Sequence, residues 1–391
     1  MDHPAATLDA WLAEAGVDGY LIDADGTDPA QRYLSGFDAP DPYLTLYTPE
    51  ELVVLVSPLE AARARRTSAA TAVVVTTELG ADRLRARYGR ATAQAVIKGA
   101  ICRQHAVGHV AVPPSTPVRT VRQLRGRGVR VTVATEDPLA ELRAVKQPEE
   151  RAAITATQAA TEDAFAAAVD LLRACDIDAA GQLRHEGEPL TSERVREEVA
   201  MTLYAAECRP GPVICAGGTQ AADPHDRGSG PLPAEAPIIL DIFPAAVASG
   251  YHADMTRTVS VGDPGARCRE WYADVAAAKA AGIEAIATDV TGEAVHEAVS
   301  GVLADAGHPT LDTDPATATG FIHATGHGVG LAVHEDPRLA PGAGPLARGA
   351  VVTVEPGLYD PAVGGIRLED LVVVTDDGAE VLTDAPETFV L

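Results

Sequence analysis

The chain has 391 residues, of which 46% are hydrophobic, and a formal net charge of −25. This length accommodates two domains with separate cores, and the composition is that of a soluble globular protein. No apolar run reaches the ~18–20 residues of a membrane helix, and a strongly acidic surface repels nucleic-acid phosphates and anionic membranes, so we expect neither as a partner.

The acidic excess is confined to the second part of the chain. Residues 1–146 carry 17 acidic and 17 basic side chains, whereas residues 147–391 carry 39 acidic and 14 basic ones. Only three of the 31 basic residues are lysines. Acid excess with scarce lysine is typical of a halophilic host, where salt screens self-repulsion, although a GC-rich genome explains the arginine bias equally well.

The cysteines and the N-terminal sequence both predict a cytoplasmic protein. The five cysteines are scattered and form no Cys-x-x-Cys pair, which indicates reduced thiols. The opening sequence MDHPAATLDAWLAEAG has no basic segment followed by an apolar one, so we expect no secretory leader.

The first part of the chain alternates strand-like and helix-like segments. The β-rich runs are VDGYLID, ELVVLVS, TAVVVTT, HVAVP and VRVTV, and helical stretches such as LEAARARR lie between them. This alternation predicts an α/β domain with a mixed or parallel sheet. Pro148, followed by two glutamates, is a good helix start, and we place the boundary between domains 1–143 and 144–391 just before it.

The second part of the chain reads as α+β. Its pattern predicts helices over residues 149–174, 192–207, 266–288 and 292–306, and strands over IILDIF, VVTVE and IRLEDLVVV. Residues 217–237 are rich in glycine, proline and aspartate, which predicts an exposed loop.

Five short strings in this second part contain the candidate metal ligands. The strings are IILDIFP, YHADMTRT, HATGHGVG, VVTVEPG and GIRLEDL, and the ligands are Asp241, Asp254, His327, Glu355 and Glu369. Four carboxylates and one imidazole favour two manganese, cobalt or similar ions over a thiolate-rich structural zinc site. Two ions roughly 3.5–4 Å apart activate a water and polarise a carbonyl, which is hydrolytic chemistry.

The local sequence around these residues fits ligand roles. Asp241 ends an apolar strand, where an unpaired carboxylate is costly, although a strand-end cap is an alternative interpretation. Glycines flank His327 and allow a tight turn, and a Pro-Gly pair stops the strand at Glu355. Arg367 and Glu369 are two residues apart on a strand, so they share a face, where the arginine can orient a ligand or form a surface ion pair.

In order and wording these strings resemble the creatinase/aminopeptidase family with the pita-bread fold, specifically its aminopeptidase P and prolidase branch. The resemblance covers residues 141–391 strongly and the earlier part, including RYLSGFDAPDPYL, more loosely. It implies a creatinase-like N-terminal α/β domain followed by a catalytic domain with a curved antiparallel sheet, helices outside and two metals inside.

The resemblance also implies roles for individual residues. Asp241 looks like the family's bidentate bridging aspartate, and Asp254 like the one that contacts both metals. His334 matches the substrate-facing histidine, His225 the second active-site histidine, and His323 a position typical of the proline-specific branch. Imidazoles at such places donate hydrogen bonds to the substrate and stabilise a tetrahedral anion.

The implied reaction is hydrolysis of the Xaa-Pro bond at the N-terminus of a peptide or in a dipeptide. Glu355 would accept the proton of the attacking water, and His334 would hold the oxyanion. His225 and His323, with Arg367 behind them, would position the substrate. Manganese is the expected metal, with cobalt or zinc as alternatives.

A homodimer is expected as well, because an arginine-rich N-terminal domain and an acidic catalytic domain favour head-to-tail pairing. A solvated helix face explains the arginines equally well.

Competing functions follow from the same fold. A creatine-amidinohydrolase-like enzyme works without metal, and a non-catalytic peptide-binding module usually loses ligands, so the intact ligand set argues against both. Methionine aminopeptidases generally lack so large an N-terminal domain, and His323 points away from them. The main alternative is a catalytically drifted pita-bread protein that binds metals and peptides without proline-specific cleavage.

Overall fold

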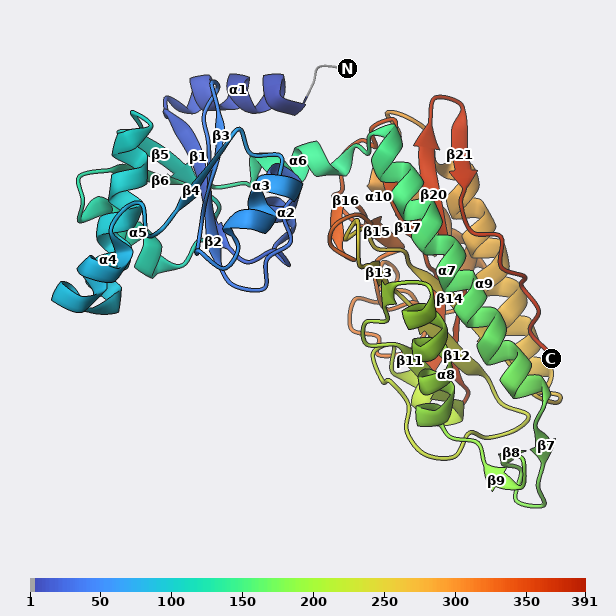
Figure 1. Cartoon of the computed structure of the whole chain (residues 1–391). Helices are drawn as coiled ribbons and strands as arrows, with labels where there is room; N and C mark the ends of the chain where they lie inside the picture. The colour runs from blue at the N-terminus through green and yellow to red at the C-terminus, as the bar shows by residue number, and fades with distance from the viewer. Residues whose placement is uncertain (1–3) are drawn as a thin grey trace. The chain divides into compact units, whose positions relative to one another are not determined.

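The computed structural model describes residues 4–391, so the leader prediction rests partly on residues outside this range. The chain divides into two compact units, Met1–Arg143 and Ala144–Leu391 (Figure 1). Within the described residues, no helix is both long enough and apolar enough to cross a membrane.

The N-terminal unit is built on a six-stranded sheet in the order β4-β3-β2-β1-β5-β6. The β1–β2 and β2–β3 pairs are antiparallel, whereas the β3–β4, β1–β5 and β5–β6 pairs are parallel. The sheet is therefore mixed, which is one of the two arrangements, mixed or parallel, that the sequence predicts. Its strands are β1 Gly19–Ala24, β2 Tyr43–Tyr47, β3 Leu52–Val56, β4 Ala72–Val75, β5 His109–Val112 and β6 Arg130–Val133. Its helices are α1 Pro4–Ala15, α2 Pro29–Ser35, α3 Ala61–Thr67, α4 Ala81–Gln104, α5 Val118–Arg125 and α6 Pro138–Ala144.

One central strand of this sheet was missing from the sequence prediction. All five residues of β2 are buried, so the strand has no polar face. Its run YLTLY has only five residues and lies between Pro42 and Pro49, and prolines at these positions favour a loop over a strand.

The C-terminal unit, Ala144–Leu391, is the expected catalytic unit, and its four long helices lie close to the predicted positions. They are α7 Pro148–Arg173, α8 Ser192–Ala205, α9 Ala266–Ala285 and α10 Gly292–Asp305. Pro148 lies in the first turn of α7, and the Glu150 carboxylate accepts the backbone N–H of Gln147 at 2.7 Å, as in a capping box. Thr191 and Thr291 cap α8 and α10 through their hydroxyls.

The strands of the catalytic unit pair antiparallel. One sheet contains β11 Ile214–Gly217, β12 Ile238–Ile242 and β14 Met255–Val259, and a second contains β15 Gly326–Gly328, β16 Glu335–Leu339, β17 Val351–Val354, β20 Asp370–Thr375 and β21 Gly378–Val381. A hairpin joins β18 Gly357–Asp360 to β19 Gly364–Arg367. Shorter elements are β7 Asp176–Ile177, β8 Leu183–His185, β9 Glu188–Pro189, β10 Cys208–Arg209, β13 Ala245–Ala246 and the 3₁₀ helix η1 Gly218–Ala222.

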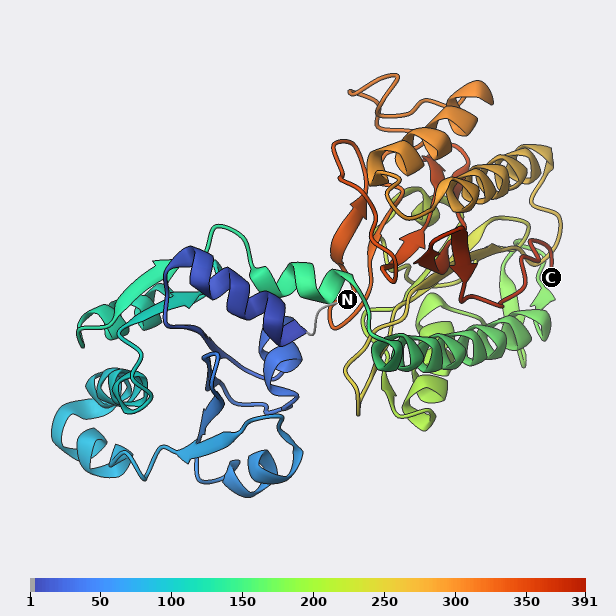
Figure 2. The ribbon, with the colours of Figure 1, turned by 90° about the horizontal axis from the view of Figure 1, so that it is seen from above.

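The helices cover these strands from outside. Helices α7 and α8 share a core with β11, β12 and β14. Helices α9 and α10 pack against β17 to β20, and the two helix pairs lie on opposite sides of the strands (Figure 2). The predicted fold, with an inner antiparallel sheet and outer helices, is confirmed.

Two sequence predictions differ from the structure in detail. The predicted loop 217–237 contains η1, and Leu232 within it is buried, so the segment is not uniformly exposed. The predicted strand IRLEDLVVV is split between two sheets, because β19 ends at Arg367 and β20 begins at Asp370. The interruption directs Leu368 into the core beneath α9 and turns Glu369 into the cavity.

Candidate metal centre

All nine residues predicted for the site line one cavity of about 300 Å³ in the catalytic unit. They are Asp241, Asp254, His327, Glu355, Glu369, His225, His323, His334 and Arg367. The ligand candidates come from different strands: Asp241 lies in β12 and His327 in β15, Glu355 directly follows β17, and Asp254 and Glu369 directly precede β14 and β20.

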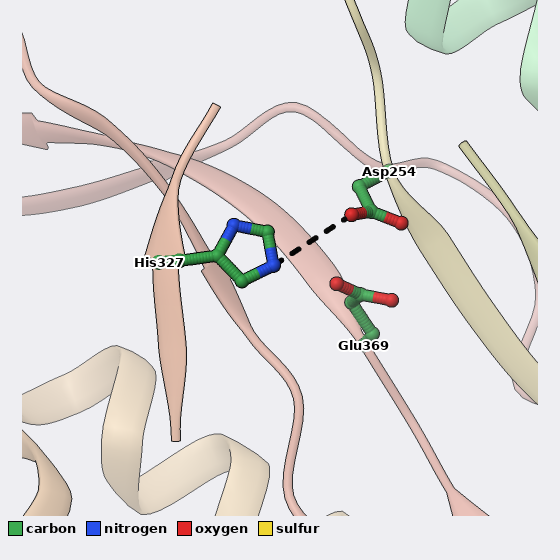
Figure 3. A group of neighbouring side chains, drawn as sticks. All are labelled: Asp254, His327 and Glu369. Atoms are coloured by element: carbon green, nitrogen blue, oxygen red, sulfur yellow. Dashed lines mark ion pairs between the residues drawn. The ribbon is translucent and has the colours of Figure 1, made fainter. Parts of the chain in front are cut away.

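Three of these residues form a compact group. Asp254, His327 and Glu369 each offer a ligand atom, and these atoms lie within 4.8 Å of one another (Figure 3). The His327 Nε2 atom lies 3.8 Å from Asp254 Oδ2 and 3.3 Å from Glu355 Oε1. The His327 Nδ1 atom lies 3.1 Å from the carbonyl oxygen of Gly328, where only an N–H can bond. This bond orients the ring so that Nε2 faces the carboxylates, as a metal ligand requires.

The fourth carboxylate is held by Arg367. The guanidinium Nη2 donates to Asp241 Oδ2 at 2.5 Å, and its Nε donates to the Thr256 hydroxyl at 3.1 Å. The Thr256 hydroxyl in turn donates to Glu369 Oε2 at 2.8 Å. Arg367 therefore orients one ligand candidate directly and a second through Thr256.

The buried carboxylates repel one another. Burial and the neighbouring charges of Glu369, Asp241 and Glu355 hold the pKa of Asp254 well above its ordinary value. Burial and the charges of Glu355 and Asp241 do the same to the pKa of Glu369. Burial opposes ionisation of Glu355 too, but the hydrogen bond and charge of His327 outweigh it and lower its pKa to about 2.

The residues fit divalent cations. The buried Asp241 Oδ1 atom has no hydrogen-bond partner in the part of the chain that the structure describes. Four carboxylates line the cavity, and among residues 4–391 the basic side chains in its lining are Arg367 and four histidines. An uncompensated buried charge is costly, so this oxygen-rich set is suited to cations that the chain itself does not supply.

The three further histidines differ in their surroundings. His225 and His334 are exposed at the cavity, and the His334 ring packs edge-to-face on His327 with 4.3 Å between the ring centroids. Although the residue is exposed, its ring is partly enclosed by the cavity, and this desolvation, followed by the nearby charge of His327, lowers the pKa of His334. His323 is enclosed: its Nδ1 donates to Ala324 O at 2.7 Å and its Nε2 lies 3.0 Å from the Tyr359 hydroxyl.

Tyr359 is a site residue that sequence reasoning missed. Its buried hydroxyl accepts a hydrogen bond from Arg367 Nη1 at 3.0 Å and reaches His323 at the same distance, so it links the two side chains. Because His323 Nδ1 donates to a carbonyl oxygen, its Nε2 carries no proton and accepts a hydrogen bond from the Tyr359 hydroxyl. In the structure Tyr359 lies in β18, which pairs with β19 and so with the strand that carries Arg367.

Comparison with known sequences agrees with this geometry. Residues 152–376 match the metallopeptidase family M24, and residues 5–145 match the creatinase/prolidase N-terminal domain. The first match covers more than half of the chain, so the chain belongs to metallopeptidase family M24. The family expected from the five strings is confirmed, and divalent metal ions are the cofactors that this family implies.

Similar proteins include peptidases from bacteria and archaea. The probable dipeptidase PepE of Mycobacterium tuberculosis is 38% identical over 180 residues, which is 46% of this chain and 46% of the relative, so the match spans about half the relative's length. The Xaa-Pro dipeptidase of Pyrococcus furiosus is 30% identical over 255 residues, or 63% of this chain and 65% of the relative. The prolidase structure from Pyrococcus horikoshii shares the fold, with a TM-score of 0.80 at 23% identity and coverage of 99% of both chains.

Proposed function

We propose that the chain is a dinuclear metal-dependent exopeptidase that hydrolyses the Xaa-Pro bond at the N-terminus of peptides or in Xaa-Pro dipeptides. The observation that carries this proposal is the convergence of five ligand-type side chains, three further imidazoles and an arginine on one cavity of residues 144–391. The substrate class is supported by relatives that are named as dipeptidases and Xaa-Pro dipeptidases.

The metals would be held by the five residues with oxygen or imidazole donors, namely Asp241, Asp254, His327, Glu355 and Glu369. When bound, two divalent ions lower the pKa of a water and polarise a carbonyl. Glu355 is ionised at neutral pH, because its pKa is about 2, and its carboxylate is available to accept a proton in the cavity.

The remaining residues would bind and orient the substrate. Exposed His334 and His225 line the cavity with ring nitrogens that can donate to a peptide carbonyl. His323 acts differently from its expected role, because both of its ring nitrogens are engaged; we assign it to holding Tyr359 and, through Tyr359, Arg367. The apolar side chains that complete the lining fit a pyrrolidine ring; they are Ile214, Phe243, Ile322 and Val333.

Four finer features belong to the same proposal: manganese as the metal, a homodimer, a cytoplasmic location and adaptation to high salt. Oxygen-rich ligands support manganese, and the charge of −25 supports salt adaptation. Light scattering at high salt tests the dimer, and a single monomer peak would remove it. Full stability in dilute buffer would argue against the halophilic hypothesis.

The decisive experiment measures release of the N-terminal residue from Xaa-Pro, Xaa-Pro-Yaa and Xaa-Ala peptides. Chelator-stripped protein is assayed with Mn²⁺, Co²⁺ or Zn²⁺ restored, at low and high KCl. We expect metal-dependent cleavage of proline peptides, with the dipeptide alone indicating a prolidase and the longer peptide an aminopeptidase P. Two bound ions without cleavage of any proline peptide would contradict the proposal and favour the drifted pita-bread protein.

A further inference from the structure

We infer that a buried ion pair between Lys146 and Glu335 positions His334 for the reaction. Lys146 Nζ donates to Glu335 Oε1 at 2.7 Å, and the two side chains are only 1% and 3% exposed. Glu335 directly follows His334, whose own side chain is exposed. The inference rests on the proposed function, because it concerns the group that would contact the substrate.

His334 lies on a bend between two anchored strands. Residues 329–334 join β15, which carries His327, to β16, which begins at Glu335. The start of the bend is held at Gly330, which donates to Ala332 O at 3.0 Å and accepts from the His252 backbone N–H at 2.8 Å. The end is held at Glu335, so an exposed imidazole takes its position from the buried residue next to it.

The lysine is itself fixed by backbone contacts. The backbone N–H of Lys146 donates to Gly349 O at 3.0 Å, and the preceding residue, Val145, forms an isolated antiparallel β-bridge with Ala350. Ala350 immediately precedes β17, the strand that leads to Glu355. The ion pair therefore ties the bend that carries His334 to β17, the strand that precedes the ligand candidate Glu355.

The backbone leaves room for this pair at one glycine. A Cβ on Gly330 would lie 2.0 Å from Glu335 Oε1, 2.7 Å from Glu335 Cδ and 3.0 Å from Lys146 Cε. Cβ atoms essentially never lie within 3.0 Å of another heavy atom that is not bonded nearby, so a side chain at position 330 would displace the ion pair. Gly330 does not have a positive φ, so alanine is tolerated by the backbone and opposed only by the pair.

An ion pair suits a positioning role better than an apolar contact does. Burying two charges yields little net stability compared with a well-packed apolar pair. A charged hydrogen bond, however, has a defined length and direction, and it fixes Glu335 and hence the backbone that carries His334. The pair thus contributes geometry, which an apolar contact of equal stability would not supply.

Three variants test this role in the metal-loaded enzyme. Lys146→Met removes one charge, Lys146→Met/Glu335→Gln removes both, and Gly330→Ala keeps both charges but displaces them. We expect each variant to lower kcat by about 10- to 100-fold, because small displacements of a catalytic group have effects of that size. We expect metal affinity, measured by chelator competition, to stay within about twofold of the parent value in each variant, because none of the three residues is a ligand candidate.

The double variant separates positioning from stability. Removing both charges leaves no unpaired buried ion, so its thermal stability should recover relative to Lys146→Met while kcat stays low. Recovery of both would show a structural role only and overturn the inference. Lys98→Met, which breaks a comparable Lys–Asp pair in the N-terminal unit, is the matched control and should leave kcat unchanged.

A crystal structure of Gly330→Ala provides a readout that does not depend on activity. We expect the His334 ring to leave its edge-to-face contact with His327, where the ring centroids are 4.3 Å apart. An unchanged ring position would overturn the inference even if the parent enzyme proved inactive on proline peptides. Conversely, a displaced ring in an inactive parent would retain the positioning role and reject only the proposed substrate.

Discussion

Buried charges are balanced differently at two places in this protein, a lysine–aspartate pair in the N-terminal unit and the cavity of the catalytic unit. In the N-terminal unit, Lys98 pairs with Asp23 and donates to the Thr120 hydroxyl at 2.8 Å, while that hydroxyl donates to the same carboxylate. Both charges of this pair, Lys98 and Asp23, therefore have a partner from the chain. In the cavity of the catalytic unit, four carboxylates face one arginine and four histidines.

The difference separates structural charges from functional ones. A carboxylate that is matched by a lysine contributes to folding and requires nothing further. Burial and then their mutual repulsion raise the pKa values of carboxylates in excess, as at Asp254 and Glu369, and such groups are stabilised only when protons or cations enter. An unbalanced cluster in a cavity is therefore a better indication of a site than buried charge alone.

The largest effect is expected from removing a carboxylate on the unbalanced side. Asp254→Asn deletes a ligand candidate, so kcat/KM on Xaa-Pro should fall by more than the about 10–100-fold that loss of an outer partner costs. The bound metal, measured by elemental analysis after dialysis, should fall with it. Asp305→Asn, an exposed residue at the end of α10, is the control. Full activity of Asp254→Asn would remove this residue from the metal site.

The opposite result is expected on the balanced side. Lys98→Met leaves Asp23 without its cation and should lower the free energy of unfolding by about 3 kcal/mol, the lower end for broken buried pairs. Metal content and kcat should not change. Denaturant unfolding followed by a metal assay measures both, and a loss of bound metal would erase the distinction between the two units.

The sequence indicates the ligand candidates, which line one cavity in the structure, because each one lies in a distinctive local string. His327 between glycines and Glu355 before Pro-Gly carry their own backbone context. The interactions that orient the ligands are not local. Lys146 and Glu335 are 189 residues apart, and Arg367 and Asp241 are 126 apart, so no pattern in either segment reveals the pairing.

Local pattern also fails where tertiary structure overrides it. IRLEDLVVV reads as one strand, yet Arg367 and Asp370 belong to different sheets. His323 reads as a substrate donor, but whether its ring is free depends on Tyr359, which no motif assigned to the site. The composition of the site is therefore largely readable from the sequence, while its hydrogen-bond connectivity is not.

A smaller effect is expected from the link that sequence analysis missed. Tyr359→Phe keeps the buried ring but removes the hydroxyl that joins Arg367 to His323. We expect kcat to fall about 10-fold, as for other partners behind a ligand. Tyr272→Phe is a matched control, since the buried Tyr272 hydroxyl has no hydrogen-bond partner among the described residues. Equal effects of the two substitutions would show that Tyr359 serves packing alone.

The smallest effect concerns the pH dependence of the metal-free protein. The pKa values of Asp254 and Glu369 are raised in the folded state, so folding takes up protons at these groups. Their contribution to stability is complete below the unfolded pKa values of about 4 and is lost as pH rises through the raised values. Glu355, with a lowered pKa of about 2, acts in the opposite sense and only in strong acid.

Metal-free protein should therefore lose stability as the pH rises above the unfolded pKa values of about 4, by at most about 1.4 kcal/mol per pH unit for each proton released. Bound cations replace those protons, so the metal-loaded protein should not show this loss. The charge of −25 also destabilises the chain as pH rises, but it does so equally in Asp254→Asn/Glu369→Gln. Urea unfolding of both proteins in chelator isolates the cavity, because the double variant should have the flatter profile. Identical profiles would mean that the carboxylate excess is relieved by solvent, and the contrast between the two units would then lie in geometry rather than in charge.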